Sequence, residues 1–167
     1  TQRDVAAALE MYRSLNGAEQ LRDGSLQYRR RRFEVRSFPI GIDAATFAAE
    51  AGRSDGRALL NLAPDERLVI GVDRLDYSKG LDNRMMAFGR YLKARGADDP
   101  RASLLQIAPP TREEVEAYQQ IRDDLERISG KVNGLYSDLG WTPIRYIHRG
   151  IARDTLASLY RAADVGF

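Results

Sequence analysis

Residues 68–81 read LVIGVDRLDYSKGL, and this stretch decides the fold class of the chain. It begins as an apolar, largely β-branched run of strand length and stops at a charged turn. After the turn, apolar side chains recur at helical spacing at Leu81, Met85, Phe88 and Leu92. A strand, a charged loop and a helix in this order predict an open α/β sheet with a ligand site at its carboxyl edge.

The loop carries two cations, Arg74 and Lys79, and Gly80 lets the backbone come close to whatever they bind. A helix that starts here adds free N–H groups and the positive end of its dipole. Two fixed cations beside a helix N-terminus suit a phosphate or a diphosphate. The stretch has neither the P-loop motif nor a G-x-G-x-x-G after the strand. The alternative is a solvated turn in which the cations pair with Asp73 and Asp76.

From residue 67 onward the chain alternates strand and helix patterns. Strands are expected at 67–72, 103–107 and 144–148, helices at about 81–95, 112–129 and 153–163, and a fourth strand from 164. This alternation predicts a parallel, doubly wound α/β sheet. The loops that follow the strands then lie at one edge, which brings Arg74 and Lys79 near two further loops. These loops carry Arg112, Gly150 and Ile151.

The chain before residue 67 has a different pattern. A helix is expected at 2–15, short strands at 26–28 and 33–38, a bend at 38–43 and a helix at 44–51. The basic quartet Arg29–Arg32 between the two strands is interpreted as part of an exposed hairpin or of an edge strand protected by charge. A nucleic-acid surface is disfavoured because no clustered aromatic residues or wider basic face accompany it. Residues 52–66 are the best linker candidate.

Composition excludes several classes of site. The 167 residues include 26 basic and 24 acidic side chains, and the net charge of +2 gives no global drive toward nucleic acid or membrane. The chain has no cysteine and one histidine, which excludes disulfides, thiolate metal sites and His-rich metal sites. No apolar run approaches the roughly 20 residues of a membrane span, and no signal peptide is visible. A soluble cytoplasmic protein is therefore expected.

The sequence resembles the trehalose-6-phosphate synthases over essentially its whole length. The matching segments are VDRLDYSKGL at 72–81, FPIGID at 38–43, QIAP at 106–109, GWTP at 140–143 and LYRAADVG at 159–166. The family consists of retaining sugar-nucleotide glycosyltransferases of the GT-B type, with two Rossmann-like domains and an active site in the cleft between them. The resemblance implies glucosyl transfer from UDP-glucose to glucose 6-phosphate, without a metal or another cofactor.

The resemblance also implies roles for individual residues. Arg74 and Lys79 match the pair that binds the UDP diphosphate and offsets the charge that grows on this leaving group, so they are the principal catalytic candidates. Arg112 matches the arginine that grips the acceptor phosphate. Ile107, Gly150 and Ile151 match positions on the uracil side of the donor site. In the implied mechanism the acceptor hydroxyl attacks on the face from which UDP leaves, with the diphosphate acting as base.

The resemblance predicts a domain organisation as well. Residues 1–55 are expected to be the end of an N-terminal, acceptor-side domain, 56–66 the linker, and 67–167 the first part of a C-terminal, nucleotide-sugar-binding domain. The chain is interpreted as an internal fragment, inactive by itself, because the segments that hold the donor sugar and complete the acceptor site lie outside it. The full-length form is expected to be a homo-oligomer.

Three functional alternatives stay open at this stage. The acceptor could be another phosphorylated compound such as glycerol 3-phosphate, and the nucleotide could be GDP. A non-catalytic homologue that senses sugar phosphates is a different class altogether.

Three further residues are given structural roles or are left ambiguous. His148, the single histidine, is interpreted as structural, and Trp141 as a packing anchor at a bend. Asp76 is expected either to orient Arg74 or to cap a helix.

Overall fold

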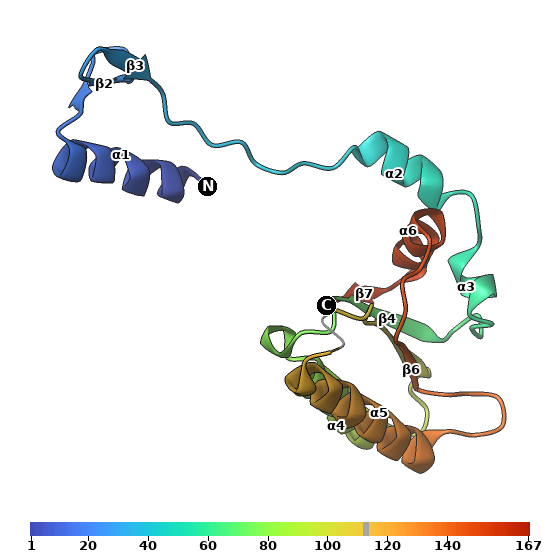
Figure 1. Ribbon diagram of the computed structural model, residues 1–167. Helices are drawn as coiled ribbons and strands as arrows, with labels where there is room; N and C mark the ends of the chain where they lie inside the picture. Colours follow the sequence, from blue (N-terminus) through green and yellow to red (C-terminus); the bar gives the residue numbers. More distant parts are fainter. Residues whose placement is uncertain (112–113) are drawn as a thin grey trace. The chain divides into compact units, whose positions relative to one another are not determined.

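The computed structural model describes residues 1–111 and 114–167. They divide into two compact units, residues 1–43 and residues 44–167, shown in Figure 1. Among the described residues, no helix combines the length and the apolar character that crossing a membrane requires.

The first unit consists of one helix and a small antiparallel sheet. Its elements are α1 (Gln2–Asn16), β1 (Glu19–Gln20), β2 (Leu26–Tyr28) and β3 (Arg31–Phe33), with the strand order β1-β2-β3. A capping box between Thr1 and Asp4 starts α1, and Gly17 ends it with a φ of 62°. The ring of Tyr12 on α1 packs edge-on against Phe33 on β3, at 5.1 Å between centroids.

The hairpin predicted around Arg29–Arg32 is confirmed, because β2 pairs with β3 and all four arginines are exposed. The strand predicted at 33–38 is wrong, since β3 ends at Phe33 and residues 34–43 form no helix or strand. Phe33 and Val35 alternate with charged residues as in a strand, but Phe38 is exposed and residues 34–38 pair with no strand among the described residues. An alternating pattern makes a strand only where a neighbour pairs with its backbone.

The second unit is built on a parallel sheet of four strands. They are β4 (Arg67–Val72), β5 (Ala102–Ile107), β6 (Ile144–Ile147) and β7 (Val165–Gly166), in the order β6-β5-β4-β7. The first strand is thus central: the next two extend the sheet on one side, and the last joins on the other side. This reversal between β4 and β7 is the topological switch point of a doubly wound sheet, where such folds bind ligands.

Helices cover both faces of this sheet, as Figure 1 shows. One face packs against α4 (Leu81–Ala94) and α5 (Glu116–Tyr136). The other packs against α6 (Arg153–Ala162), which in turn contacts α2 (Ala44–Ala51) and α3 (Gly56–Leu59). Buried side chains alternate between the two cores along β4, β5 and β6, as the pleat requires. On β5, Ala102 and Leu104 belong to the first core, and Leu105 and Ile107 to the second.

Helix α5 differs from its predicted range of 112–129. It begins at Glu116 and continues to Tyr136, so Gly130 and Gly134 do not end it. A glycine inside a helix costs about 1 kcal/mol relative to alanine. Burial of Val132 and a pair of hydrogen bonds offset this: the Asn133 side chain donates to the Ile144 carbonyl at 2.8 Å and accepts from its N–H at 2.9 Å.

The predicted linker, 56–66, contains a helix. Asp55 caps α3 by accepting from the N–H groups of Arg57 and Ala58, and Gly56 is buried against α6. The Arg57 guanidinium donates at 2.7 Å to each of the carbonyls of Ala63 and Glu66. The compact unit that contains the parallel sheet therefore begins at Ala44. The domain boundary at 56–66 stays a prediction.

A buried polar chain ties the amino ends of the strands together. Glu66, which is 4% exposed, accepts from the Ala63 N–H at 3.2 Å and from the Ser103 hydroxyl. The indole N–H of Trp141 donates to the same hydroxyl at 3.0 Å. Trp141 is 6% exposed, so its predicted role as a packing anchor is confirmed.

Asp164, just before β7, should make stability sensitive to acid. Its carboxylate accepts from the Leu68 N–H at 2.8 Å and from Arg67 at 3.0 Å. These bonds, first that from Leu68, lower the pKa of Asp164 below its usual 3.8. A lowered pKa adds stability that is complete above the unfolded-state pKa and is lost as the pH falls through the folded-state pKa.

We therefore expect Asp164→Asn to lower the melting temperature at pH 7 and to reduce the further drop between about pH 5 and pH 2. Thermal melts across this range, with the exposed Asp98→Asn as control, measure the effect. Equal pH dependence of parent and Asp164→Asn would contradict this role for the carboxylate.

Candidate functional site

The loops after β4, β5 and β6 lie at one edge of the sheet, as predicted. Backbone hydrogen bonds hold them together: Asp73 N–H donates to the Ile107 carbonyl at 3.1 Å, and Leu75 N–H to that of Pro109 at 3.1 Å. Ala108 N–H donates to the Ile147 carbonyl at 2.9 Å. The three loops therefore form a fixed rim beside the switch point.

The loop after β4 has a defined conformation. Leu75 is buried at 3% exposure and anchors the loop to the core below it. Asp76 begins a short 3₁₀ helix, η1 (Tyr77–Lys79), and Gly80 follows with a φ of 59°. This left-handed conformation favours glycine and lets the chain turn into α4 at once. No side chain among the described residues caps α4, so its first N–H groups face the loop without a side-chain acceptor.

The two predicted anion ligands, Arg74 and Lys79, are both exposed on this loop. The ion pairing expected for a solvated turn is weak here, because the Lys79 ammonium lies 4.0 Å from the Asp73 carboxylate. Asp76 serves as the cap: it accepts from the Ser78 hydroxyl at 2.7 Å and from its N–H at 2.9 Å. These bonds, with a smaller effect of Arg74, lower the pKa of the Asp76 carboxyl. An exposed arginine and lysine beside an uncapped helix N-terminus are groups that favour anion binding, so this loop is the candidate site.

The remaining predicted residues occupy the same edge or fall outside the described part. Ile107 ends β5 with its side chain buried in the core. Gly150 is exposed in the loop after β6, with open space where a Cβ would be, and Ile151 packs at the border of the second core. Arg112 lies outside the described residues. The uracil-side and acceptor roles of these residues stay predictions.

The His148 side chain makes a hydrogen bond to the backbone of a neighbouring loop. Its Nδ1 lies 3.0 Å from the Ala108 carbonyl, and so it donates to that oxygen and joins the rims of β5 and β6. This contact agrees with the structural interpretation.

Sequence reasoning missed Arg84 and Gln106. Arg84 lies in the first turn of α4, and its guanidinium is 2.9 Å from the Asp73 carboxylate and donates to Gln106 Oε1 at 2.9 Å. Two features of the sequence indicate this pair. Gln106 is a polar residue inside an apolar strand, so it requires a hydrogen-bond partner. Arg84 flanks the apolar stripe of α4, where a long cation reaches back over the strand end.

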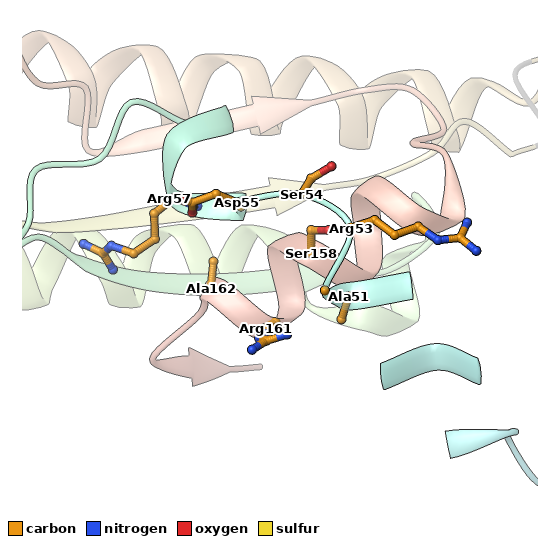
Figure 2. A pocket seen from close by; sticks show the side chains of 10 residues that line it. Ala51, Arg53, Ser54, Asp55, Arg57, Ser158, Arg161 and Ala162 are labelled. Atoms are coloured by element: carbon orange, nitrogen blue, oxygen red, sulfur yellow. The ribbon is translucent and has the colours of Figure 1, made fainter. Parts of the chain in front are cut away.

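A cavity of about 440 Å³ lies elsewhere, between the end of α2, α3 and α6. It is lined by three arginines, but Figure 2 shows the side chains of Arg53 and Arg57 pointing in opposite directions. Arg57 is held by carbonyls of the segment before β4 and lies 3.9 Å from Asp164, before β7. These contacts are at the amino ends of the strands, far from the loop edge. Arg53 and Arg57 therefore do not converge on a common ligand.

Among the residues that the structure describes, no three His, Asp or Glu side chains lie together in a group that could hold a metal ion.

Comparison with known proteins identifies the family. A model of glycosyltransferase family 20 matches residues 1–167. Trehalose-6-phosphate synthase from Mycobacterium sp. (strain JLS) is 39% identical over 149 residues, which are 86% of this chain and 31% of the relative. The enzyme from Sinorhizobium fredii is 41% identical over 147 residues, which are 86% of this chain and 32% of the relative.

Solved structures that resemble this chain belong to trehalose-phosphate synthases as well. A UDP-forming synthase from Burkholderia xenovorans is 38% identical with a TM-score of 0.79, and the match covers 99% of this chain and 38% of that one. The Burkholderia xenovorans enzyme in complex with glucose-6-phosphate has a TM-score of 0.76 at 38% identity, with the same coverage. The E. coli protein bound with UDP-2-fluoro glucose has a TM-score of 0.79 at 33% identity, over 99% of this chain and 38% of that one.

The chain thus spans about a third of the length of these relatives. The predicted fold class is confirmed: this is part of the GT-B fold of the trehalose-phosphate synthases, built on a doubly wound parallel sheet. With the family model matching from end to end, the chain belongs to glycosyltransferase family 20.

Proposed function

We propose that the gene product containing this chain transfers glucose, with retention of configuration, from UDP-glucose to glucose 6-phosphate. The observation that carries the proposal is the loop after β4, which presents Arg74 and Lys79 beside the uncapped start of α4, at the switch point of the sheet. Two relatives add chemical support, one solved with glucose-6-phosphate and one with UDP-2-fluoro glucose.

In this proposal Arg74 and Lys79 bind the diphosphate of the donor. Negative charge grows on the diphosphate as the glycosidic bond breaks, so fixed cations stabilise the transition state more than the ground state. The acceptor hydroxyl attacks from the face that UDP leaves, and the departing diphosphate takes its proton. We assign the acceptor phosphate to Arg112 and the uracil side to Ile107, Gly150 and Ile151.

The two cations take the place that a metal ion has in other phosphate-dependent transferases, so we propose that the reaction is metal-independent. A cytoplasmic location, where sugar nucleotides and sugar phosphates occur together, belongs to the same proposal. Homo-oligomer formation stays a prediction from the family resemblance.

The test is UDP release by the full-length gene product from UDP-glucose, with glucose 6-phosphate or glycerol 3-phosphate as acceptor. We expect release with glucose 6-phosphate only, unchanged by EDTA, and a raised KM for this acceptor in Arg112→Ala. Reactions without acceptor and with GDP-glucose are the controls.

Other outcomes are informative. Release with glycerol 3-phosphate alone would change the acceptor, and release from GDP-glucose alone would change the donor. Binding of sugar phosphates without release from either donor would replace the transferase with a sensor.

A further inference from the structure

Arg84 joins three segments at the switch point. Its side chain is 14% exposed and contacts Asp73 after β4 and Gln106 on β5, both at 2.9 Å. The guanidinium also lies over the ring of Phe167, which follows β7, at 5.4 Å from the centroid. One cation therefore bridges the carboxyl ends of the three strands around the switch point.

Hydrogen bonds of Gln106 hold the contact between Arg84 and β5 in place. Gln106 is fully buried, and its Nε2 donates to the carbonyls of Gly71 at 3.2 Å and Ile107 at 3.3 Å. Its Oε1 is thereby turned toward Arg84. A Cβ at position 71 would lie 2.4 Å from Arg84 Nη1 and 2.6 Å from Gln106 Oε1. The two side chains occupy the space that the glycine leaves open.

The charges explain why the bridge matters. The loop from Asp73 to Lys79 carries two carboxylates and two cations, and without a further cation it is neutral. Asp76 is engaged by the N–H and hydroxyl groups of Ser78. Asp73 is left facing both Lys79 at 4.0 Å and Arg84 at 2.9 Å. Arg84 is the closer and more buried partner, so it takes the larger share of the pairing.

We propose that Arg84 is a positioning residue: by neutralising Asp73, it leaves the Lys79 ammonium available to the diphosphate of the donor. This inference rests on the proposed function. Without Arg84, the Asp73 carboxylate attracts Lys79 and competes with the diphosphate for it. The loop also loses its net positive charge, which weakens its attraction for any anion.

The test is UDP affinity, measured by titration calorimetry on the full-length gene product with four changes: Arg84→Met, Arg84→Lys, Asp73→Asn and the double variant Arg84→Met with Asp73→Asn. We expect Arg84→Met to raise the Kd for UDP about tenfold, in the range for coupled neighbours. The double variant should return to within about threefold of the parent, because the competing carboxylate is gone. Arg90→Met, an exposed change on the same helix, should leave the Kd unchanged.

If Arg84 had a purely structural role, removing the Asp73 carboxylate would not restore the affinity for UDP. Weak UDP binding in a folded double variant, or an unchanged Kd in Arg84→Met, would therefore overturn the inference. If Arg84→Met does not fold, Arg84→Lys, measured alone and combined with Asp73→Asn, provides the same comparison, with a smaller loss of UDP affinity that Asp73→Asn again restores. Failure of the parent to bind UDP would instead contradict the proposed function.

Discussion

Replacing Lys79 or Arg74 with alanine is expected to lower kcat for UDP release by about 10²–10³-fold, the usual loss when one group that stabilises transition-state charge is removed. Both side chains are exposed at the carboxyl edge of the sheet, and neither anchors the core. The fold should therefore survive the change. KM for UDP-glucose should rise less than kcat falls, because the charge on the diphosphate is greatest in the transition state.

Steady-state kinetics of the full-length gene product measure the effect, with circular dichroism to confirm folding. Lys93→Ala is the matched control, since Lys93 is an exposed cation in the last turn of α4, away from the loop. Parental kcat in both Arg74→Ala and Lys79→Ala would establish the solvated turn as the correct interpretation of the loop.

Gly56→Ala is expected to destabilise the second unit by about 3 kcal/mol, the upper end of the usual range for overpacking. The new Cβ would lie 2.3 Å from the Ser158 carbonyl oxygen and 2.8 Å from its carbon, both backbone atoms of α6. It would also lie 2.9 Å from the Ala162 Cβ. No side chain can move aside to relieve these contacts, so α3 must separate from α6.

Gly134→Ala is the control for the same chemical change. Gly134 lies within α5, where nothing stands within 4 Å of the new Cβ. Alanine is the better helix former by about 1 kcal/mol, so this variant should be more stable than the parent. Urea unfolding curves of both variants check the two signs, and a stable Gly56→Ala would mean that α3 is not packed against α6 as described.

Much of the fold could be predicted because the determining signals are local. The β-branched run before Asp73 and the apolar stripe of α4 specify a strand and a helix within about 25 residues. The strand predicted at 33–38 and the predicted end of α5 were wrong because these features depend on contacts with residues distant in the sequence. Residues 34–38 of the predicted strand pair with no strand in the described part of the chain. Gly130 does not end α5 because the Asn133 side chain is hydrogen-bonded to Ile144.

The candidate site was only partly predictable, for a related reason. Arg74 and Lys79 stand in one short loop, so their spacing shows them directly. Arg84 is ten residues from Arg74, and its partner Gln106 is 22 residues further on, so pairing them requires knowledge of which strands are neighbours. The left-handed turn at Gly80 could be anticipated, but the direction in which Arg84 reaches over Gly71 could not.

The order β6-β5-β4-β7 also has a consequence for synthesis on the ribosome. Because β4 is both the first strand of the sheet to be made and a central one, every later strand finds its partner already translated. β5 pairs with β4, β6 with β5, and β7 again with β4. The second edge of β4, in contrast, stays unpaired until β7 has been made, so this edge is the one exposed longest while the sheet forms.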